Sequence, residues 1–125
     1  VTERVPSAYL VPENLEPVLN SLADHGVRFE PLPAPFTGRV ERFRITVQQV
    51  APREFEGRIE RTIEGVWEPA NVTVPAGTLR VDMNQPLARL IFSLLEPRSA
   101  DGLATWGTFG SALDGATEYP ILRVE

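Results

Sequence analysis

Hydrophobic and polar residues alternate along the middle of this chain with the two-residue period of β-strands. Within Val40–Val50, the apolar Phe43, Ile45 and Val47 alternate with polar side chains. Between residues 54 and 68 one parity is apolar, interrupted by an arginine, and its apolar members are Phe55, Ile59, Ile63 and Trp67. The other parity is largely acidic, so each strand is predicted to have one buried and one solvated face.

We therefore predict that Val40–Val50 and Glu54–Val66 pair as an antiparallel hairpin. In the expected register Arg44 lies opposite Glu60, because opposite charges across two strands stabilise the pair. The predicted buried face of this hairpin consists of Phe43, Ile45, Val47, Phe55, Ile59 and Ile63.

Two segments change to the helical period. The first stripe consists of Leu15, Val18, Leu19 and Leu22, and the second of Leu87, Leu90, Ile91, Leu94 and Leu95. Asn14 and Asn84 are the predicted N-caps, with Pro17 and Pro86 in the first turns and Gly26 as a helix stop. Because helices this short are marginal in water, each stripe must be buried, and Ile91 is predicted to be core.

Short apolar runs predict the remaining strands, which are Ala8–Val11, Val27–Leu32, Asn71–Val74, Leu79–Met83 and Glu118–Val124. A small right-handed β-α-β unit is predicted from the strand Ala8–Val11, the first helix and the strand Val27–Leu32. Pro75-Ala76-Gly77-Thr78 has the composition of a turn. The expected fold is α+β, mainly an antiparallel, sandwich-like sheet with the N-terminal β-α-β unit and two short helices. Residues 1–125 fit a single domain, which we expect to be cut from a longer chain.

Composition removes several classes of function. The chain has one histidine and no cysteine, which excludes thiol nucleophiles, disulfides and any zinc site that needs two His or Cys ligands. It has no lysine, so Schiff-base chemistry is excluded, and no Gly-x-Ser-x-Gly element. A net charge of −5 disfavours nucleic acid as a partner, and no apolar run is long enough to span a membrane. We expect no catalytic and no metal-binding residue in this chain.

Five features that could carry chemistry also have simpler explanations. His25 ends the first predicted helix, where an imidazolium favours the helix dipole, whereas a catalytic base needs a partner and a nucleophile. An acidic series could be read as a hydrolytic pair or cation site, but a solvated strand face produces the same spacing in Glu54, Glu56, Glu60 and Glu64. Asp101-Gly102 is predicted to be a turn, and Asn71-Val72-Thr73 matches the short glycosylation pattern. Trp106 and Phe109, in a glycine-rich stretch, are either a satellite core or a possible interface.

A resemblance adds to this picture. The segments that carry it are Pro75-Ala76-Gly77-Thr78-Leu79, Gln85-Pro86-Leu87-Ala88-Arg89-Leu90, Leu94-Leu95-Glu96-Pro97-Arg98-Ser99-Ala100-Asp101-Gly102-Leu103 and Trp106. Together with pieces near both ends of the chain, they resemble the region after the catalytic domain in bacterial proteins of the zinc carboxypeptidase (carboxypeptidase A-like) family. The chain departs from that pattern in Gly107-Thr108-Phe109-Gly110, where a polar–aromatic pair is expected.

The resemblance implies a role for the parent protein rather than a reaction in this chain. The family's His-x-x-Glu pair, distant His, substrate-clamping arginine and catalytic glutamate have no counterpart here. It implies a non-catalytic C-terminal companion that docks on the catalytic domain of the same chain and shapes its cleft rim, with zinc held by that catalytic domain and no cofactor here. It also implies a periplasmic or secreted location. The alternative is a glycan or cell-wall binding module, which should show a concave surface lined by aromatic and polar groups.

Overall fold

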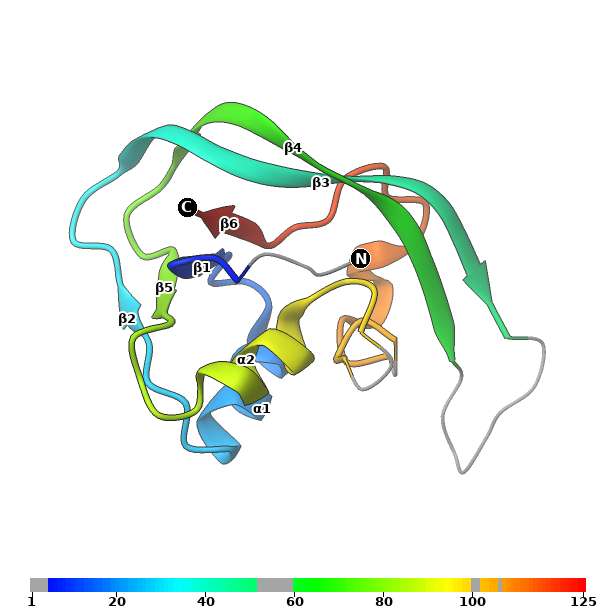
Figure 1. Ribbon diagram of the computed structural model, residues 1–125, viewed down its shortest axis with the longest axis horizontal. Helices are drawn as coiled ribbons and strands as arrows, with labels where there is room; N and C mark the ends of the chain where they lie inside the picture. The colour runs from blue at the N-terminus through cyan, green and yellow to red at the C-terminus, as the bar shows by residue number, and fades with distance from the viewer. Residues whose placement is uncertain (1–4, 52–59, 100–101, 106) are drawn as a thin grey trace.

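The computed structural model describes residues 5–51, 60–99, 102–105 and 107–125. The strands are β1 (Ala8–Val11), β2 (Glu30–Pro31), β3 (Phe36–Val50), β4 (Arg61–Val74), β5 (Leu79–Asp82) and β6 (Leu122–Val124). The helices are α1 (Glu16–Asp24), α2 (Ala88–Leu95) and the short 3-10 helix η1 (Gly110–Leu113). The strands form one antiparallel six-stranded sheet, and both α-helices lie together on one side of it (Figure 1). The expected α+β class with a mainly antiparallel sheet is confirmed.

The sheet order is β2-β5-β1-β6-β3-β4. Strands β1 and β2 each pair antiparallel with β5, so they run parallel to one another with β5 between them. The predicted β-α-β unit is therefore present in a split form. The strand predicted over Val27–Leu32 is shorter than expected, because only Glu30 and Pro31 pair with β5. Pro31 and Pro33 have no backbone N–H to donate to a neighbouring strand.

The long hairpin of β3 and β4 forms as predicted, but its register does not. Arg44 lies opposite Val66, so the expected pairing of Arg44 with Glu60 is wrong. Strand β3 ends at Val50, which lies opposite Arg61, the first residue of β4. Arg44 instead forms its ion pair with Glu68. Phe55 and Ile59, which were expected on the buried face, lie outside the described residues.

A β-bulge at Thr46 changes which side chains face the core. Ile45 lies opposite Gly65 and Val47 opposite Glu64, so Thr46 is the extra residue. Because side chains alternate along a strand, one extra residue inverts every position after it. Phe43 is buried and Ile45 packs against the core as expected, but Val47 is 45% exposed, contrary to the prediction.

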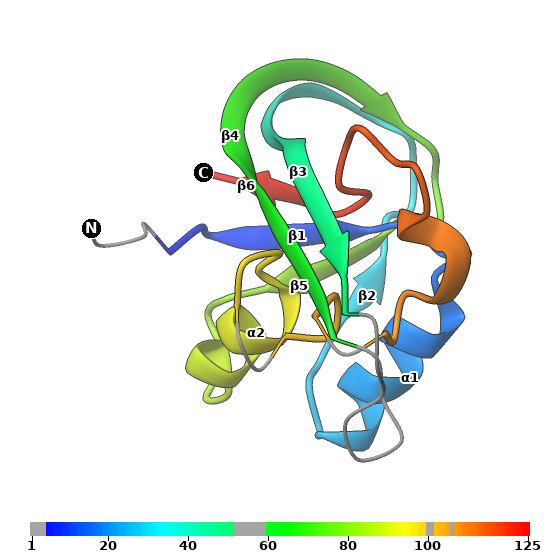
Figure 2. The ribbon, with the colours of Figure 1, turned by 90° about the vertical axis from the view of Figure 1, so that its right-hand side faces the viewer.

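The sheet buries a hydrophobic cluster on each face. The larger cluster lies under the helices, and it includes Tyr9, Val11, Val81, Phe43 and Ile63 with Val18, Leu22, Ile91 and Leu95. The smaller cluster consists of Leu10, Val40, Val72 and Leu122. Leu10 and Leu122 are on the face opposite to the helices, and one half of the β3–β4 hairpin curls over this face, as its strong curvature shows (Figure 2). The layered character of the fold therefore comes from the curvature of a single sheet.

Both helices bury the predicted stripes, whereas the predicted caps are wrong. Ile91 and Leu95 are 0% exposed, and Gly26 follows α1 with a φ of 81°. The residues before the helices are Leu15 and Leu87, and neither makes a side-chain cap bond. Asn84 belongs to a turn, because its N–H donates to Oδ1 of Asp82 at 2.8 Å. No helix in the described part of the chain is long and apolar enough to cross a membrane.

Gly65 is required by the close approach of β3. A Cβ at this position would lie 2.1 Å from the carbonyl oxygen of Arg44 and 2.8 Å from the ring of Phe43. We expect Gly65→Ala to lower the free energy of unfolding by about 3 kcal/mol, because backbone must move to admit the methyl group. Urea denaturation measures this change. Gly115→Ala is the control, since its φ of 68° is unfavourable but no atom lies within 4 Å; it should cost only about 1 kcal/mol. Equal losses in the two variants would contradict the steric argument.

Candidate functional site

His25 lies at the end of α1, where the sequence places it. Its backbone N–H donates to the carbonyl oxygens of Ser21 and Leu22 at 3.2 Å each, and its Nδ1 lies 2.7 Å from the Ser21 oxygen. The ring is exposed and is bound to its own helix. The structure thus places His25 as a helix C-cap.

The acidic strand residues do not converge on one point. Glu60 and Glu64 are exposed, and Oε1 of Glu64 lies 3.0 Å from Nε of Arg98. Glu54 and Glu56 lie outside the described residues. Within the described ranges, no three His, Cys, Asp or Glu side chains gather as a metal site would require.

Of the two short motifs, the glycosylation pattern lies at the surface. Asn71 is exposed on β4, and Oγ1 of Thr73 lies 3.0 Å from Oγ1 of Thr37 on the neighbouring strand. Asp101 lies outside the described residues. The N–H of Gly102 donates to the Ser99 carbonyl at 3.0 Å.

Phe109 belongs to the main core. Its side chain is 5% exposed, and its ring centroid lies 5.3 Å from that of Tyr119. The side chain of Phe109 therefore packs with the main hydrophobic cluster. Trp106 lies outside the described residues, so its assignment to a core or an interface stays a prediction.

A buried polar cluster that the sequence analysis did not foresee surrounds Glu96. The Tyr9 hydroxyl donates to Oε2 of Glu96 at 2.5 Å, and Nε1 of Trp67 donates to Oε1 at 3.2 Å. Nε of Arg123 lies 3.5 Å from Oε2, and the guanidinium lies 4.6 Å from the centroid of the Trp67 ring. Glu96 and Arg123 are only 5% and 3% exposed. We call these four residues, Tyr9, Trp67, Glu96 and Arg123, the Glu96 cluster.

The Glu96 cluster joins the end of α2 to three strands, β1, β4 and β6. The burial of Arg123 could have been predicted from the sequence. In a strand, every second side chain faces the same way, so Arg123 faces the same side as Tyr119 and Ile121, and both of these are buried. The burial of Glu96 could not be predicted from neighbouring residues. A glutamate directly after an apolar helix stripe is usually exposed at the end of the helix. Because Glu96 accepts hydrogen bonds from residues of β1 and β4 and faces Arg123 of β6, the cluster links the end of α2 to the sheet.

Both tyrosines of the chain are held in their neutral form. Burial and then the nearby carboxylate of Glu96 raise the pKa of Tyr9 far above its usual value, and its hydrogen bond to Glu96 acts in the same direction. Burial, followed by the charge of Glu96, also raises the pKa of Tyr119, whose hydroxyl donates to the Leu95 carbonyl at 2.6 Å.

These raised pKa values predict a loss of stability in alkaline solution. Below about pH 10 the folded and unfolded chains both keep the tyrosine protons; above it only the unfolded chain releases them. The free energy of unfolding should therefore fall with rising pH, by up to about 1.4 kcal/mol per pH unit for each tyrosine. Urea midpoints measured between about pH 9 and 11 test this expectation, with tyrosinate absorbance recorded in parallel. Tyrosinate that formed while the protein stayed folded would contradict it.

An apolar hollow of about 350 Å³ opens on the face opposite to the helices. Its floor includes Leu10, Leu122 and Thr78, all at most 7% exposed. Its walls include three prolines, Pro12, Pro75 and Pro120, and Glu13 and Asn14 lie at its rim. The hollow therefore reaches the smaller of the two hydrophobic clusters, to which Leu10 and Leu122 belong.

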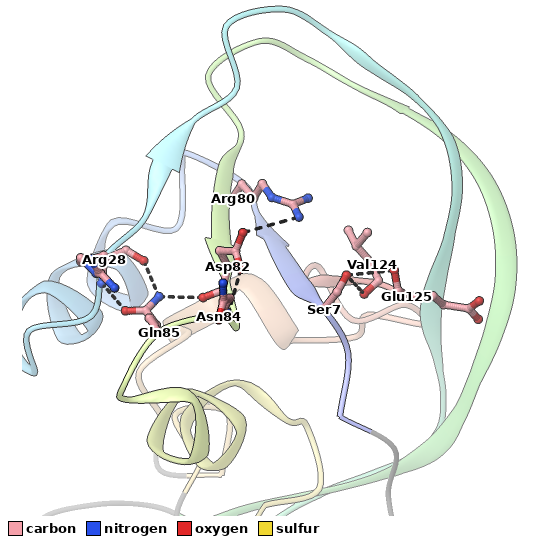
Figure 3. A network of polar contacts seen from close by, with 8 residues as sticks. All are labelled: Ser7, Arg28, Arg80, Asp82, Asn84, Gln85, Val124 and Glu125. Carbon is pink, nitrogen blue, oxygen red and sulfur yellow. Dashed lines mark hydrogen bonds and ion pairs between the residues drawn. The ribbon is translucent and has the colours of Figure 1, made fainter.

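A second, polar hollow of about 330 Å³ lies at the β2–β5 edge. Its most connected side chain is Gln85, which accepts from the N–H of Arg28 and donates to the carbonyls of Arg28 and Asp82 (Figure 3). Asp82 in turn accepts from Asn84 and faces Arg80 at 3.8 Å. Most of these polar groups are thus engaged in holding neighbouring loops together. On the same view Ser7 ties the start of β1 to the end of β6 by donating to the carbonyls of Val124 and Glu125.

Neither hollow shows the aromatic lining that a glycan-binding surface needs. The apolar hollow has no aromatic residue, and the polar hollow has Phe29, which is half-buried against the main core. Among the described residues the exposed large hydrophobic side chains are all valines, namely Val5, Val47, Val50 and Val66. No observation in the described part of the chain favours the glycan-binding alternative.

Comparisons with known proteins support the carboxypeptidase part of the resemblance. No family model matches the sequence, and no solved structure is significantly similar. All 125 residues align with carboxypeptidase 2 of Trichophyton tonsurans at 33% identity, of Trichophyton equinum at 31% and of Trichophyton rubrum at 30%. These relatives are fungal, so they do not support the expected likeness to bacterial proteins. Along its whole length the chain is thus similar to a segment that spans 23% of each of these carboxypeptidase 2 proteins.

Proposed function

We propose that this chain is a non-catalytic companion domain, placed C-terminal to the catalytic domain of a zinc carboxypeptidase-like parent. It docks on that catalytic domain and shapes the rim of its cleft. One observation supports this most directly: all 125 residues given match less than a quarter of each carboxypeptidase 2 relative, which leaves most of the relative for the catalytic machinery. We also propose a periplasmic or secreted location for the parent, from the family resemblance.

The distribution of side chains in the domain supports the same assignment. The chain has a single histidine, and that histidine caps a helix. Its buried carboxylate, Glu96, is surrounded by Tyr9, Trp67 and Arg123 and is 5% exposed, so a substrate has little access to it. The domain has two hydrophobic clusters of its own, as expected for a folded unit within a longer polypeptide.

Separation of the two parts tests the proposal. The domain and the rest of the parent polypeptide are produced as two chains, and binding is measured by calorimetry. We expect the two chains to bind, the domain alone to have no peptidase activity, and its addition to change the KM of the other chain for peptides. Two chains that do not bind, or peptidase activity in the domain alone, would contradict the proposal.

Zinc should remain with the rest of the parent. Structural and catalytic zinc sites typically use at least two His or Cys ligands, and this chain has one His and no Cys. The isolated domain is therefore expected to retain no stoichiometric zinc after dialysis against a weak chelator. Metal analysis of the two separated chains measures this distribution. Zinc that copurified with the domain would show that the metal assignment is wrong.

A further inference from the structure

We propose that the apolar hollow beside β1 and β6 is the docking site on this domain, and that it receives an apolar side chain, flanked by a basic residue, from the catalytic part of the parent. This inference rests on the proposed function, because it names the surface through which docking occurs. Three observations support it: the unequal covering of the two sheet faces, the rigid walls of the hollow, and the negative charge at its rim.

The two faces of the sheet are covered unequally. The larger cluster is covered by α1 and α2, whereas the smaller cluster has only the curled half of the β3–β4 hairpin over it. The apolar hollow lies at the end of that cover, between the start of α1 and the end of β4, with Val74 on one side. Its floor residues Leu10 and Leu122 are core residues of the smaller cluster. An apolar side chain inserted there would extend this cluster and gain burial without any rearrangement.

The walls of the hollow are already fixed in shape. Pro12, Pro75 and Pro120 each have a restricted φ angle and a ring that has no rotamers to lose. The turn that carries Pro75 is closed by the N–H of Thr78, which donates to the Pro75 carbonyl at 3.3 Å. A preformed site avoids the entropy cost of ordering flexible side chains on binding. The hollow is therefore suited to a protein side chain as an anchor.

The rim selects the charge of the occupant. Glu13 lies beside the Gly77 backbone, where a Cβ on Gly77 would come within 2.8 Å of Oε2 of Glu13. Glu13 is exposed and, within the described ranges, forms no ion pair. A basic residue next to the apolar anchor would pair with this carboxylate, whereas the free carboxylate of a peptide C-terminus would be repelled. The hollow thus favours an internal segment of the parent over a substrate end.

Variants at the hollow test this inference in the same two-chain binding experiment. Glu13→Arg reverses the rim charge and should weaken binding about tenfold, and Val74→Phe fills the hollow and should weaken it at least as much. Glu16→Arg is the matched control, because Glu16 is a nearby exposed acid on α1 that does not line the hollow. Thermal unfolding of each variant confirms that it is folded. The methyl resonances of Leu10 and Leu122 provide an independent readout, and they should shift on binding more than those of Ile91 under the helices.

The outcomes separate the two proposals. If the unmodified domain does not bind, both the docking function and this site are wrong. If it binds and the Glu13 and Val74 variants bind equally well, with the Leu10 and Leu122 methyls unmoved, docking stands and the assignment of the hollow is wrong. Tighter binding by Glu13→Arg would show that the occupant is acidic and would overturn the proposed chemistry.

Discussion

Replacing Glu96 by alanine should lower the free energy of unfolding by about 3–5 kcal/mol, which is the usual effect of removing one partner from a buried ion pair. The variant removes the carboxylate that faces Arg123, and Arg123 is only 3% exposed. It also takes away the acceptor of two hydrogen bonds, those donated by the Tyr9 hydroxyl and the Trp67 indole. Each buried donor left without its acceptor adds a desolvation penalty. Urea denaturation of the domain measures the loss.

Two variants show whether burial is the cause. Glu96→Gln keeps an oxygen acceptor but removes the charge, so its loss should lie between those of the wild type and Glu96→Ala. Glu68→Ala removes the carboxylate of the Arg44–Glu68 pair, whose side chains are 56% and 47% exposed, and should cost at most about 1 kcal/mol. A Glu96→Ala variant that was no less stable than Glu68→Ala would show that the Glu96 cluster contributes little to folding.

Truncation of Ile91 should also have a large effect. Ile91 is 0% exposed, and it lies at the centre of the α2 stripe that packs into the main core. Ile91→Ala should lower the free energy of unfolding by about 2–5 kcal/mol through lost burial and the cavity left behind. Leu90→Ala is the control, because Leu90 is only partly buried at the edge of the same core. An unchanged urea midpoint for Ile91→Ala would contradict the packing of α2 on the sheet.

The Glu96 cluster and the apolar hollow are connected through the strands that they share. Tyr9 and Arg123 point to the helix side, and their neighbours Leu10 and Leu122 point to the opposite face and form the floor of the hollow. Strands β1 and β6 pair with one another, with Leu10 opposite Leu122. By fixing these two strands from one face, the cluster keeps the apolar hollow on the other face in a constant shape.

The elements with local signals could be predicted from the order of the residues. The helical spacing of Leu87, Leu90, Ile91, Leu94 and Leu95 predicted α2 and its buried centre, because 3.6-residue periodicity reports directly which face is apolar. The two-residue period predicted that β3 and β4 form a hairpin, and Pro75-Ala76-Gly77-Thr78 predicted a turn, in which Gly77 has a φ of 91°. The lack of cysteine and the single histidine also restricted the possible chemistry, because side chains that are absent from a chain cannot be supplied by its folding.

The strand register and the two sites depend instead on tertiary contacts. The bulge at Thr46 inverts the parity of β3 beyond Ile45, and a bulge depends on the partner strand rather than on the local pattern. Strand β5 separates β1 from β2, a long-range choice that no nearby residue specifies. Glu96 and Tyr9 are 87 positions apart, and the apolar hollow combines residues from both ends of the chain. Such contacts depend on how distant segments meet in space, which a periodic pattern within one segment does not encode.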